Sequence, residues 1–348
     1  MNSEKVSCEI CSSKNYSLIQ SKGKVGKFGQ YGDLNIIQCQ KCGHVFQEEK
    51  RNIEKNKKFF KTDYHSLNSH YSDDQEAIKS QLSRSKGILK YLKGTFPKNK
   101  KLLDLGCGYG YIMQNFIQAG YKCSGIDPDQ SCVDFAQTNS NLDVILGSSE
   151  NLPYKDASFD IVISLGTLEH VSDLKKSLKE IWRVLSKDGI LFLRMRPNRI
   201  WGLPYEYFNI STIRYFSIET QLLSLLLNGF SSHLINKEQL EGRNGDVYIS
   251  VRKSEDKPPS LDFLIKNGFF DKPGALSIYL KNHYHELFKK SKELLNLVGT
   301  NNENIDSVVS QIESGTFNYP LFTGYTDTKS ALLRGIQEAH ITIKEPWI

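Results

Sequence analysis

Four cysteines form two closely spaced pairs near the start of the sequence. Two residues separate Cys8 from Cys11 and Cys39 from Cys42, and 27 residues lie between the pairs. Two thiolates at this spacing grip one Zn²⁺ from a tight turn, and two such turns complete a tetrahedral site. A site with four protein ligands leaves no position for water or substrate, so we expect a structural Zn²⁺ rather than a catalytic one.

A glycine-rich loop runs from a predicted strand, Leu102–Leu105, into a predicted helix. Gly106 and Gly108 allow a tight turn and let a ligand approach the backbone without an intervening Cβ. The third glycine of the dinucleotide-binding pattern is missing, since Tyr111 stands at its position. Asp104 would also repel a pyrophosphate, whereas a cation such as S-adenosylmethionine, with its ammonium and sulfonium groups, would be attracted.

Three further motifs follow at the ends of later strands. Asp127 ends the next strand, 23 residues after Asp104, where a carboxylate can accept hydrogen bonds from both ribose hydroxyls. Ser149 and Glu150 lie in the segment after the third strand, and Ser164 ends the fourth. Four ordered motifs are a more specific signal than one glycine loop.

These four segments, in this order and spacing, resemble the class I S-adenosylmethionine-dependent methyltransferases over about residues 100–253. The resemblance implies that S-adenosyl-L-methionine is the cofactor. The following residues would bind it: Asp104, Gly106 and Gly108 at the methionine end, Asp127 at the ribose, Ser149 and Glu150 at the adenine, and Ser164 beneath the methionine. The family often has Asp where this sequence has Ser148.

Fewer sequence features indicate which residues would bind or activate the molecule that receives the methyl group. His170 follows the fourth strand and titrates near neutral pH, so it is a candidate general base, or it positions the substrate. An aromatic and basic segment after residue 196 could stack on a ring and hold an anionic group, or it could be a lid that packs on the core. Its candidate substrate-binding residues are Arg199, Trp201, Tyr205, Tyr207 and Arg214.

The elements that must position these residues alternate along the chain. Short apolar runs alternate with amphipathic stretches of helical length from Lys101 onward, which is typical of βαβ units and a parallel sheet. Asn244-Gly245 predicts a turn before a last strand, Val247–Val251, so the parallel core would end in a β-hairpin. We therefore expect an α/β fold: a Rossmann-like, mostly parallel seven-stranded sheet with an N-terminal zinc ribbon and an α-rich C-terminal region.

Composition changes along the chain suggest four regions. These are a zinc-ribbon module (1–50), a helical connector (51–98), a methyltransferase core (99–253) and an α-rich C-terminal region (254–348). The sequence has no segment long and apolar enough to span a membrane and no signal peptide at Met1–Cys8, so we expect a cytoplasmic protein. Nothing in the sequence fixes the oligomeric state.

The basic residues are concentrated at the N-terminus. Residues 1–61 carry 12 Lys and Arg against 6 Asp and Glu, although the whole chain has a net charge of only +6. Similarity to methyltransferases that act on sugars favours a sugar or another small molecule of surface-glycan or natural-product biosynthesis as the substrate. One alternative is an RNA methyltransferase whose basic run Lys50–Lys61 follows a phosphate backbone. Another is a zinc module that docks a protein partner.

Overall fold

The computed structural model describes the central part of the chain almost continuously and the two ends in shorter pieces. The described residues are 6–22, 34–48, 58, 75–95, 100–195, 212–234, 247–254, 257–266, 293–294, 296–299, 304–314, 316, 329 and 332. They form two compact units, one containing a seven-stranded sheet and the other a four-stranded sheet. No helix among them combines the length and the apolar character that a membrane crossing requires.

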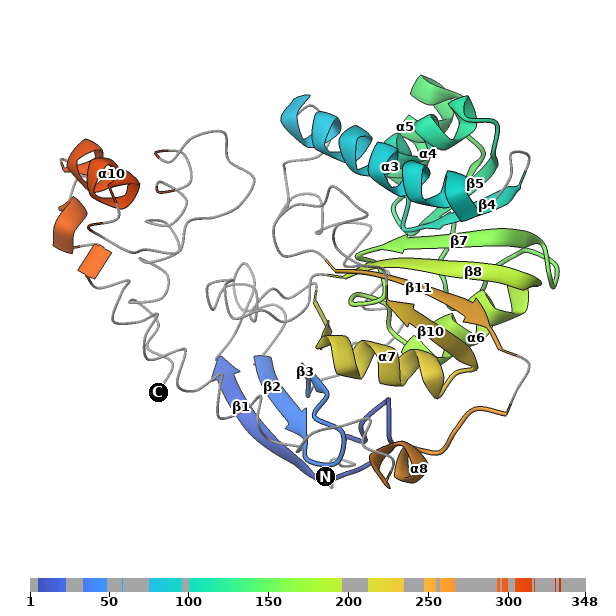
Figure 1. Cartoon of the computed structure of the whole chain (residues 1–348), viewed down its shortest axis with the longest axis horizontal. Coiled ribbons are helices and arrows are strands. Elements are labelled where there is room, and N and C mark those ends of the chain that lie inside the picture. The colour runs from blue at the N-terminus through green and yellow to red at the C-terminus, as the bar shows by residue number, and fades with distance from the viewer. Residues whose placement is uncertain are drawn as a thin grey trace. The chain divides into compact units, whose positions relative to one another are not determined.

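The seven-stranded sheet contains one strand that runs against the others (Figure 1). In spatial order its strands are β10 (Phe230–Leu234), β11 (Val247–Lys253), β8 (Leu185–Met195), β7 (Phe159–Leu165), β4 (Lys101–Leu105), β5 (Lys122–Asp127) and β6 (Val144–Leu146). β11 is antiparallel to both of its neighbours, whereas the pairings from β8 to β6 are all parallel. The predicted mostly parallel sheet and the antiparallel strand pair at its end are therefore confirmed, whereas the turn predicted at Asn244-Gly245 lies outside the described residues.

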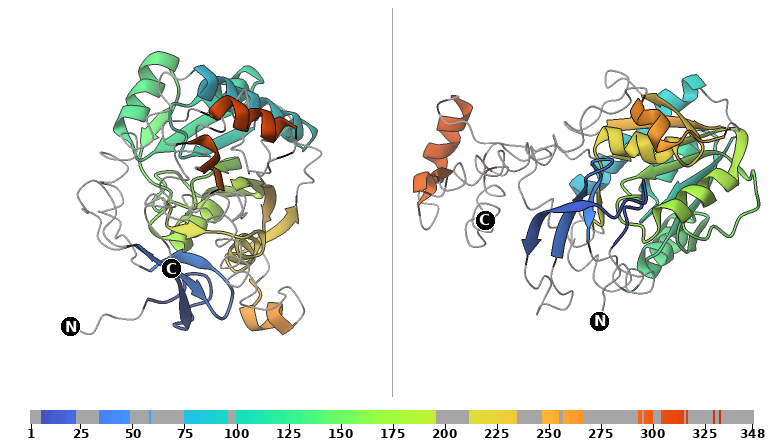
Figure 2. Two further views of the ribbon diagram at one scale, coloured as in Figure 1. Left: turned by 90° about the vertical axis from the view of Figure 1, so that its left-hand side faces the viewer. Right: turned by 90° about the horizontal axis from the view of Figure 1, so that it is seen from below.

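Helices cover both faces of this sheet, as Figures 1 and 2 show. One face carries α3 (Gln75–Thr95), α4 (Tyr111–Gln118) and α5 (Gln130–Ser140), and the other carries α6 (Leu174–Val184) and α7 (Ile218–Leu226). Asp173 caps the N-terminus of α6, because its carboxylate accepts a hydrogen bond from the Lys176 backbone N–H at 3.0 Å. α6 therefore starts at a fixed position, directly after the loop that follows β7.

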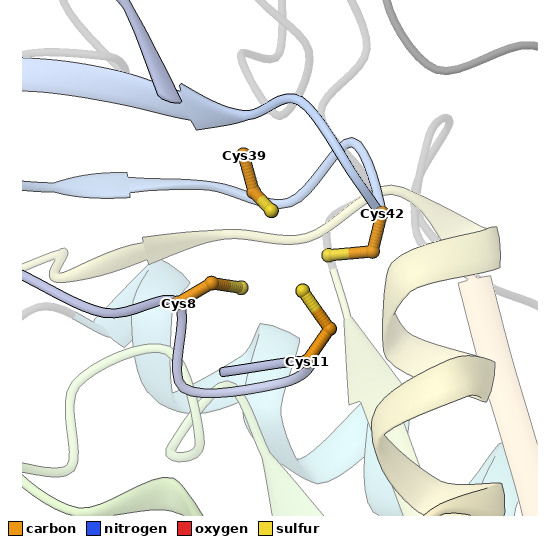
Figure 3. Close-up of side chains that lie close together, drawn as sticks. All are labelled: Cys8, Cys11, Cys39 and Cys42. Carbon is orange, nitrogen blue, oxygen red and sulfur yellow. The ribbon is translucent and has the colours of Figure 1, made fainter. Parts of the chain in front are cut away.

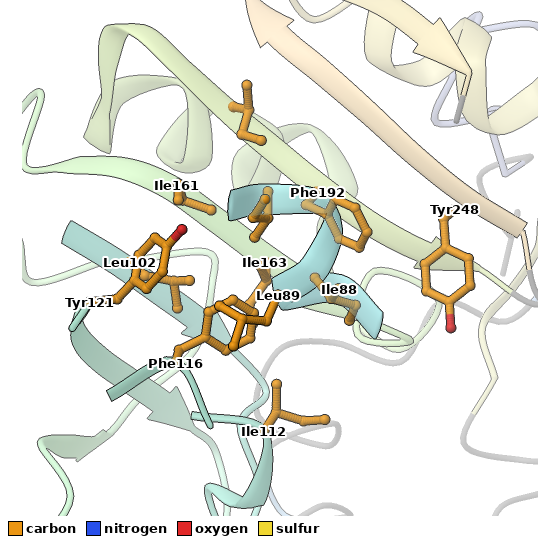
Figure 4. Packing of buried hydrophobic residues seen from close by; sticks show 12 residues of the cluster. Ile88, Leu89, Leu102, Ile112, Phe116, Tyr121, Ile161, Ile163, Phe192 and Tyr248 are labelled. Atoms are coloured by element: carbon orange, nitrogen blue, oxygen red, sulfur yellow. The ribbon is translucent and has the colours of Figure 1, made fainter. Parts of the chain in front are cut away.

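The hydrophobic core between α3, α4 and the sheet fixes the edge where the glycine loop begins. Ile88, Leu89 and Leu92 of α3 pack in one buried cluster with strand residues that include Leu102, Ile163 and Phe192 (Figure 4). The Asn115 amide of α4 also donates to the Leu82 carbonyl and the Ser85 hydroxyl of α3. α3 is thus packed into the core of the sheet unit.

The second unit contains a small antiparallel sheet. It consists of β1 (Tyr16–Lys22), β2 (Leu34–Cys39), β3 (Val45–Gln47) and β9 (Arg214–Tyr215). The apolar pairs Ile36-Ile37 and Val45-Phe46, on either side of the second cysteine pair, predict β2 and β3 as strands of a zinc ribbon. No such prediction was made for β1 or β9. β9 comes from a segment far along the chain, and the Gln47 side chain donates to the Thr212 carbonyl at 2.6 Å beside it.

Short helical pieces form the described part of the C-terminal region. They include α8 (Leu261–Lys266) and α10 (Ile305–Glu313), and Leu294, Val298, Val308 and Leu332 make a small buried cluster. The regular elements among the described residues of this region are all helical. The sequence pattern also predicts helices at Ala275–Val298 and Ser330–His340, most of whose residues lie outside the described ones.

Candidate functional site

Two buried oxygen atoms lack hydrogen-bond partners at the carboxyl ends of neighbouring strands. They are Oδ2 of Asp104 on β4 and Oγ of Ser164 on β7, whose residues are 2% and 1% exposed. The strands are in register, with Leu105 opposite Ser164, so both residues reach the same edge of the sheet. Buried polar atoms without partners are costly, and their occurrence together in the described sheet unit indicates that a ligand supplies the missing hydrogen bonds.

The electrostatics of this edge favour a positively charged ligand. Burial raises the pKa of Asp104 well above its usual value, and the nearby Asp127 carboxylate raises it further. A cation bound between these carboxylates would stabilise their ionised forms and lower that pKa. The ammonium and sulfonium groups of S-adenosylmethionine have the required charge, so the residues present fit this cofactor.

The loop between β4 and α4 is shaped by two glycines in left-handed conformations. Gly106 has φ +67°, and a Cβ there would lie 2.6 Å from the Thr167 hydroxyl oxygen. Gly108 has φ +54°, and a Cβ there would meet nothing within 4 Å. Gly106 is thus required by close packing inside the protein. Gly108 borders open space, in which a ligand can approach the backbone.

Thr167 is a supporting residue that the sequence did not reveal. Its hydroxyl donates to the Leu105 carbonyl at 2.7 Å, so it fastens the end of β4 to the loop that follows β7. A threonine at a loop position carries no sequence signal for this contact, because the contact joins segments 62 residues apart.

Asp127 braces the glycine loop. Its Oδ2 accepts from the Gly108 backbone N–H at 2.8 Å, and its Oδ1 accepts from the Asp129 backbone N–H at 2.9 Å. Each carboxylate oxygen can accept a second hydrogen bond, so these contacts leave capacity for ribose hydroxyls. The ribose contact itself stays a prediction.

Ser149 and Glu150 are both buried, and both form hydrogen bonds with residues at or just before the first turn of α6. The Ser149 hydroxyl donates to the Ser177 hydroxyl at 2.9 Å, and Glu150 Oε1 accepts from the Ser172 backbone N–H at 2.8 Å. These contacts fasten the segment after β6 to the helix that follows β7. The predicted adenine contacts of both residues stay predictions.

The residues predicted for the acceptor side are described only in part. His170 is half-buried in the loop after β7, and its backbone N–H donates to the Thr167 carbonyl at 3.0 Å. Arg214 is 1% exposed and lies on β9 of the four-stranded sheet. Arg199, Trp201, Tyr205 and Tyr207 lie outside the described residues.

The four N-terminal cysteines come together as their spacing predicts (Figure 3). The Sγ atoms of Cys8, Cys11, Cys39 and Cys42 all lie within 4.8 Å of one another, and their side chains point toward a common centre. A ZnS₄ tetrahedron with bonds of about 2.3 Å has edges of about 3.8 Å, so this arrangement is close to a zinc site. The donor set therefore fits one tetrahedral metal ion.

Comparison with known proteins identifies the part of the chain that carries the glycine loop. Residues 103–193 match the model of a family described as "Methyltransferase domain". Over these residues the chain is similar to methyltransferase domains. The match begins on β4 and ends on β8, so it contains all the cofactor-site candidates described above.

The curated relatives match about a quarter of the chain. A ubiquinone biosynthesis O-methyltransferase of Pelagibacter ubique is 33% identical over 101 residues, which are 28% of this chain and 42% of the relative. A norajmaline N-methyltransferase of Rauvolfia serpentina is 36% identical over 95 residues, which are 25% of this chain and 32% of the relative. The chain thus spans less than half the length of these relatives. Their names also differ in the atom methylated.

One solved structure to which the chain is similar is the YcgJ protein from Bacillus subtilis. It covers 49% of this chain and 99% of its own, with 19% identity and a TM-score of 0.41.

Proposed function

We propose that the whole protein is a methyltransferase that uses S-adenosyl-L-methionine as its methyl donor. The observation that carries the proposal is the pair of buried, unpartnered oxygens of Asp104 and Ser164 beside the left-handed Gly106–Gly108 loop. The raised pKa of Asp104 adds the preference for a cation. When bound, the cofactor supplies a methyl group on a positively charged sulfur, which is open to attack by a nucleophile.

The chain's own residues bind and orient in this proposal. Asp104 and Ser164 take the methionine end, Gly106 and Gly108 allow the backbone to approach, and Asp127 accepts from the ribose. Ser149 and Glu150 flank the adenine while they hold the start of α6. Rate acceleration comes largely from positioning, since displacement at a sulfonium needs the nucleophile in line with the departing sulfur.

His170 is the proposed general base for an acceptor hydroxyl. It lies in the loop after β7, six residues beyond Ser164, and its backbone is fixed by Thr167. Replacement of His170 by Ala should lower kcat by about 10²–10⁴-fold and leave cofactor affinity unchanged. Full activity in this variant would remove the assignment.

The proposed substrate is a sugar or another small molecule of surface-glycan or natural-product biosynthesis. The support is the combination of a cysteine-rich N-terminus with a methyltransferase core, and the aromatic and basic segment that contains Arg199, Trp201, Tyr205 and Tyr207. The proposed metal is Zn²⁺, held by Cys8, Cys11, Cys39 and Cys42 as a structural ion. Pairing of β3 with β9 makes the N-terminal module continuous with the segment after β8, which favours a structural role over an independent docking module.

Two measurements on the full chain test these proposals. Calorimetric titration with S-adenosylhomocysteine should show one site, and no binding would refute the cofactor proposal. Transfer of a labelled methyl group to nucleotide sugars or a glycan extract should exceed transfer to total RNA. Transfer to RNA, lost steeply as salt is added, would instead support the nucleic-acid alternative. A stable protein complex formed through residues 1–60 would support the docking alternative.

A further inference from the structure

Arg194 lies near the carboxyl end of β8, in the last part of the sheet before the undescribed segment at 196–211. It is half-buried and stands opposite Leu165 of β7 and Tyr248 of β11. Asp104 is in register with Ile163, which is in register with Phe192. Asp104 is therefore level with the residue two positions before Arg194 on β8. Strand spacing puts Asp104 and Arg194 on the same face, with their Cα atoms about 12 Å apart.

A glycine without a Cβ leaves room for the guanidinium of Arg194. Gly166 follows β7 with φ +87°, and a Cβ there would lie 3.2 Å from Nη1 of Arg194 and 3.8 Å from Oε1 of Glu169. Arg194 therefore reaches across the backbone that directly follows Ser164 and Leu165. The same stretch of backbone carries the proposed methionine contact and leads to His170, four residues after Gly166.

We propose that Arg194 binds an anionic group, a carboxylate or a phosphate, of the molecule that receives the methyl group. This rests on the proposed function. The guanidinium has five N–H donors in a planar fork, so it can hold an oxyanion in addition to any partner within the protein. Its charge is separated from the carboxylates of Asp104 and Asp127, so an anionic acceptor and a cationic cofactor are attracted to different places.

The neighbouring side chains define the rest of the acceptor. The Glu169 carboxylate beside Gly166 repels a second negative charge and accepts hydrogen bonds from a hydroxyl or an amine. The ring of Tyr248, with its centroid 5.8 Å from that of Phe192, packs next to Arg194 on β11 (Figure 4). The acceptor class is therefore a molecule with hydrogen-bond donors near its reacting end and an anionic group beyond them.

Calorimetry on the full-length protein saturated with S-adenosylhomocysteine tests this assignment. The two probes are uridine diphosphate, which carries phosphate, and benzoate, which carries a carboxylate. We expect the wild type to bind at least one probe, and Arg194→Gln to bind it about ten- to a hundredfold more weakly. The probe that binds more tightly tells which anion the site prefers.

The matched control is Arg252→Gln on the neighbouring strand. Arg252 is exposed and opposite Ile190, toward the other end of β8, and its Nη1 donates to the Asp188 carbonyl at 3.2 Å. This variant should bind the probes as the wild type does. Glu169→Gln should strengthen anion binding severalfold, since a repelling charge is removed, and it keeps the test decisive if Arg194→Gln does not fold.

Each outcome separates this inference from the proposed function. Failure of the wild type to bind S-adenosylhomocysteine refutes the cofactor proposal. Binding of S-adenosylhomocysteine without either anion refutes only the assignment of Arg194. Anion binding that neither Arg194→Gln nor Glu169→Gln alters refutes it as well.

Discussion

Replacing Asp104 by Asn should change stability and cofactor affinity in opposite directions. The carboxyl group is 2% exposed, its Oδ2 has no partner, and its raised pKa shows that the ionised form is disfavoured in the protein without cofactor. Asn removes the charge at nearly constant volume, so the free energy of unfolding of the protein without cofactor should rise, and its Tm with it. The same change removes the charged acceptor for the cofactor's ammonium group.

The expected loss of affinity follows from the strength of hydrogen bonds to charged groups. Such a bond contributes about 1.5–3 kcal/mol, so S-adenosylhomocysteine should bind about ten- to a hundredfold more weakly to Asp104→Asn. Denaturant unfolding gives the stability, and calorimetric titration gives the affinity. A residue needed only for the fold would show loss of stability with little change in affinity.

Asp160→Asn is the matched control, because Asp160 is a carboxylate on β7 whose partners are all within the protein. It accepts from the Lys100 ammonium at 3.0 Å and from the Lys101 backbone N–H at 2.9 Å. Its replacement should lower the free energy of unfolding and leave cofactor affinity intact. If Asp104→Asn behaves like Asp160→Asn, then the partnerless oxygen is not a ligand site and the reasoning is wrong.

Three further predictions concern pH, the glycine loop and the metal. Because the pKa of Asp104 is raised in the folded protein, the stability of the protein without cofactor should rise as the pH falls through that pKa. The affinity for S-adenosylhomocysteine should fall over the same pH range. Calorimetry in several buffers and at several pH values checks the sign, since binding should release a proton. Gly108→Ala should cost about 1–2 kcal/mol of stability for its left-handed φ, whereas Gly106→Ala should cost more because of the added clash with a side chain; equal losses in denaturant unfolding would contradict this. Cys39→Ser should abolish stoichiometric zinc binding in a colorimetric assay and lower Tm. Cys123→Ser is the control and should keep the metal, because burial raises the pKa of the Cys123 thiol to about 12 and that thiol is not in the four-cysteine cluster.

The central sheet was predictable because its signals are local. Apolar runs of three to seven residues predicted the strands from β4 to β8, and the structure extends β4 by one residue at its start and β5 by one residue at each end. The five added residues at the start of β8, Leu185–Gly189, were not predicted, since they are partly exposed and contain a charged pair. Burial, rather than chain composition, decides where such a strand begins.

The four-stranded sheet was only half predictable. β2 and β3 contain adjacent apolar residues and were expected, whereas β1 begins with a polar stretch and β9 has only two residues. β9 is a strand because Val45 and Phe46 pair with it from the other end of the sequence. A pairing of that kind depends on the folded chain and leaves no pattern in either segment alone.

The sequence by itself determined which kinds of ligand the protein is expected to bind. Residue type and spacing predicted a cation-binding loop with Asp104 and Asp127, and a four-sulfur metal site, because both depend on a few residues close together in the chain. The tertiary structure alone decided which oxygens lack partners, that Thr167 holds β4, and that Arg194 reaches across Gly166. These facts depend on atoms brought together by strand register and burial, and a linear sequence contains neither.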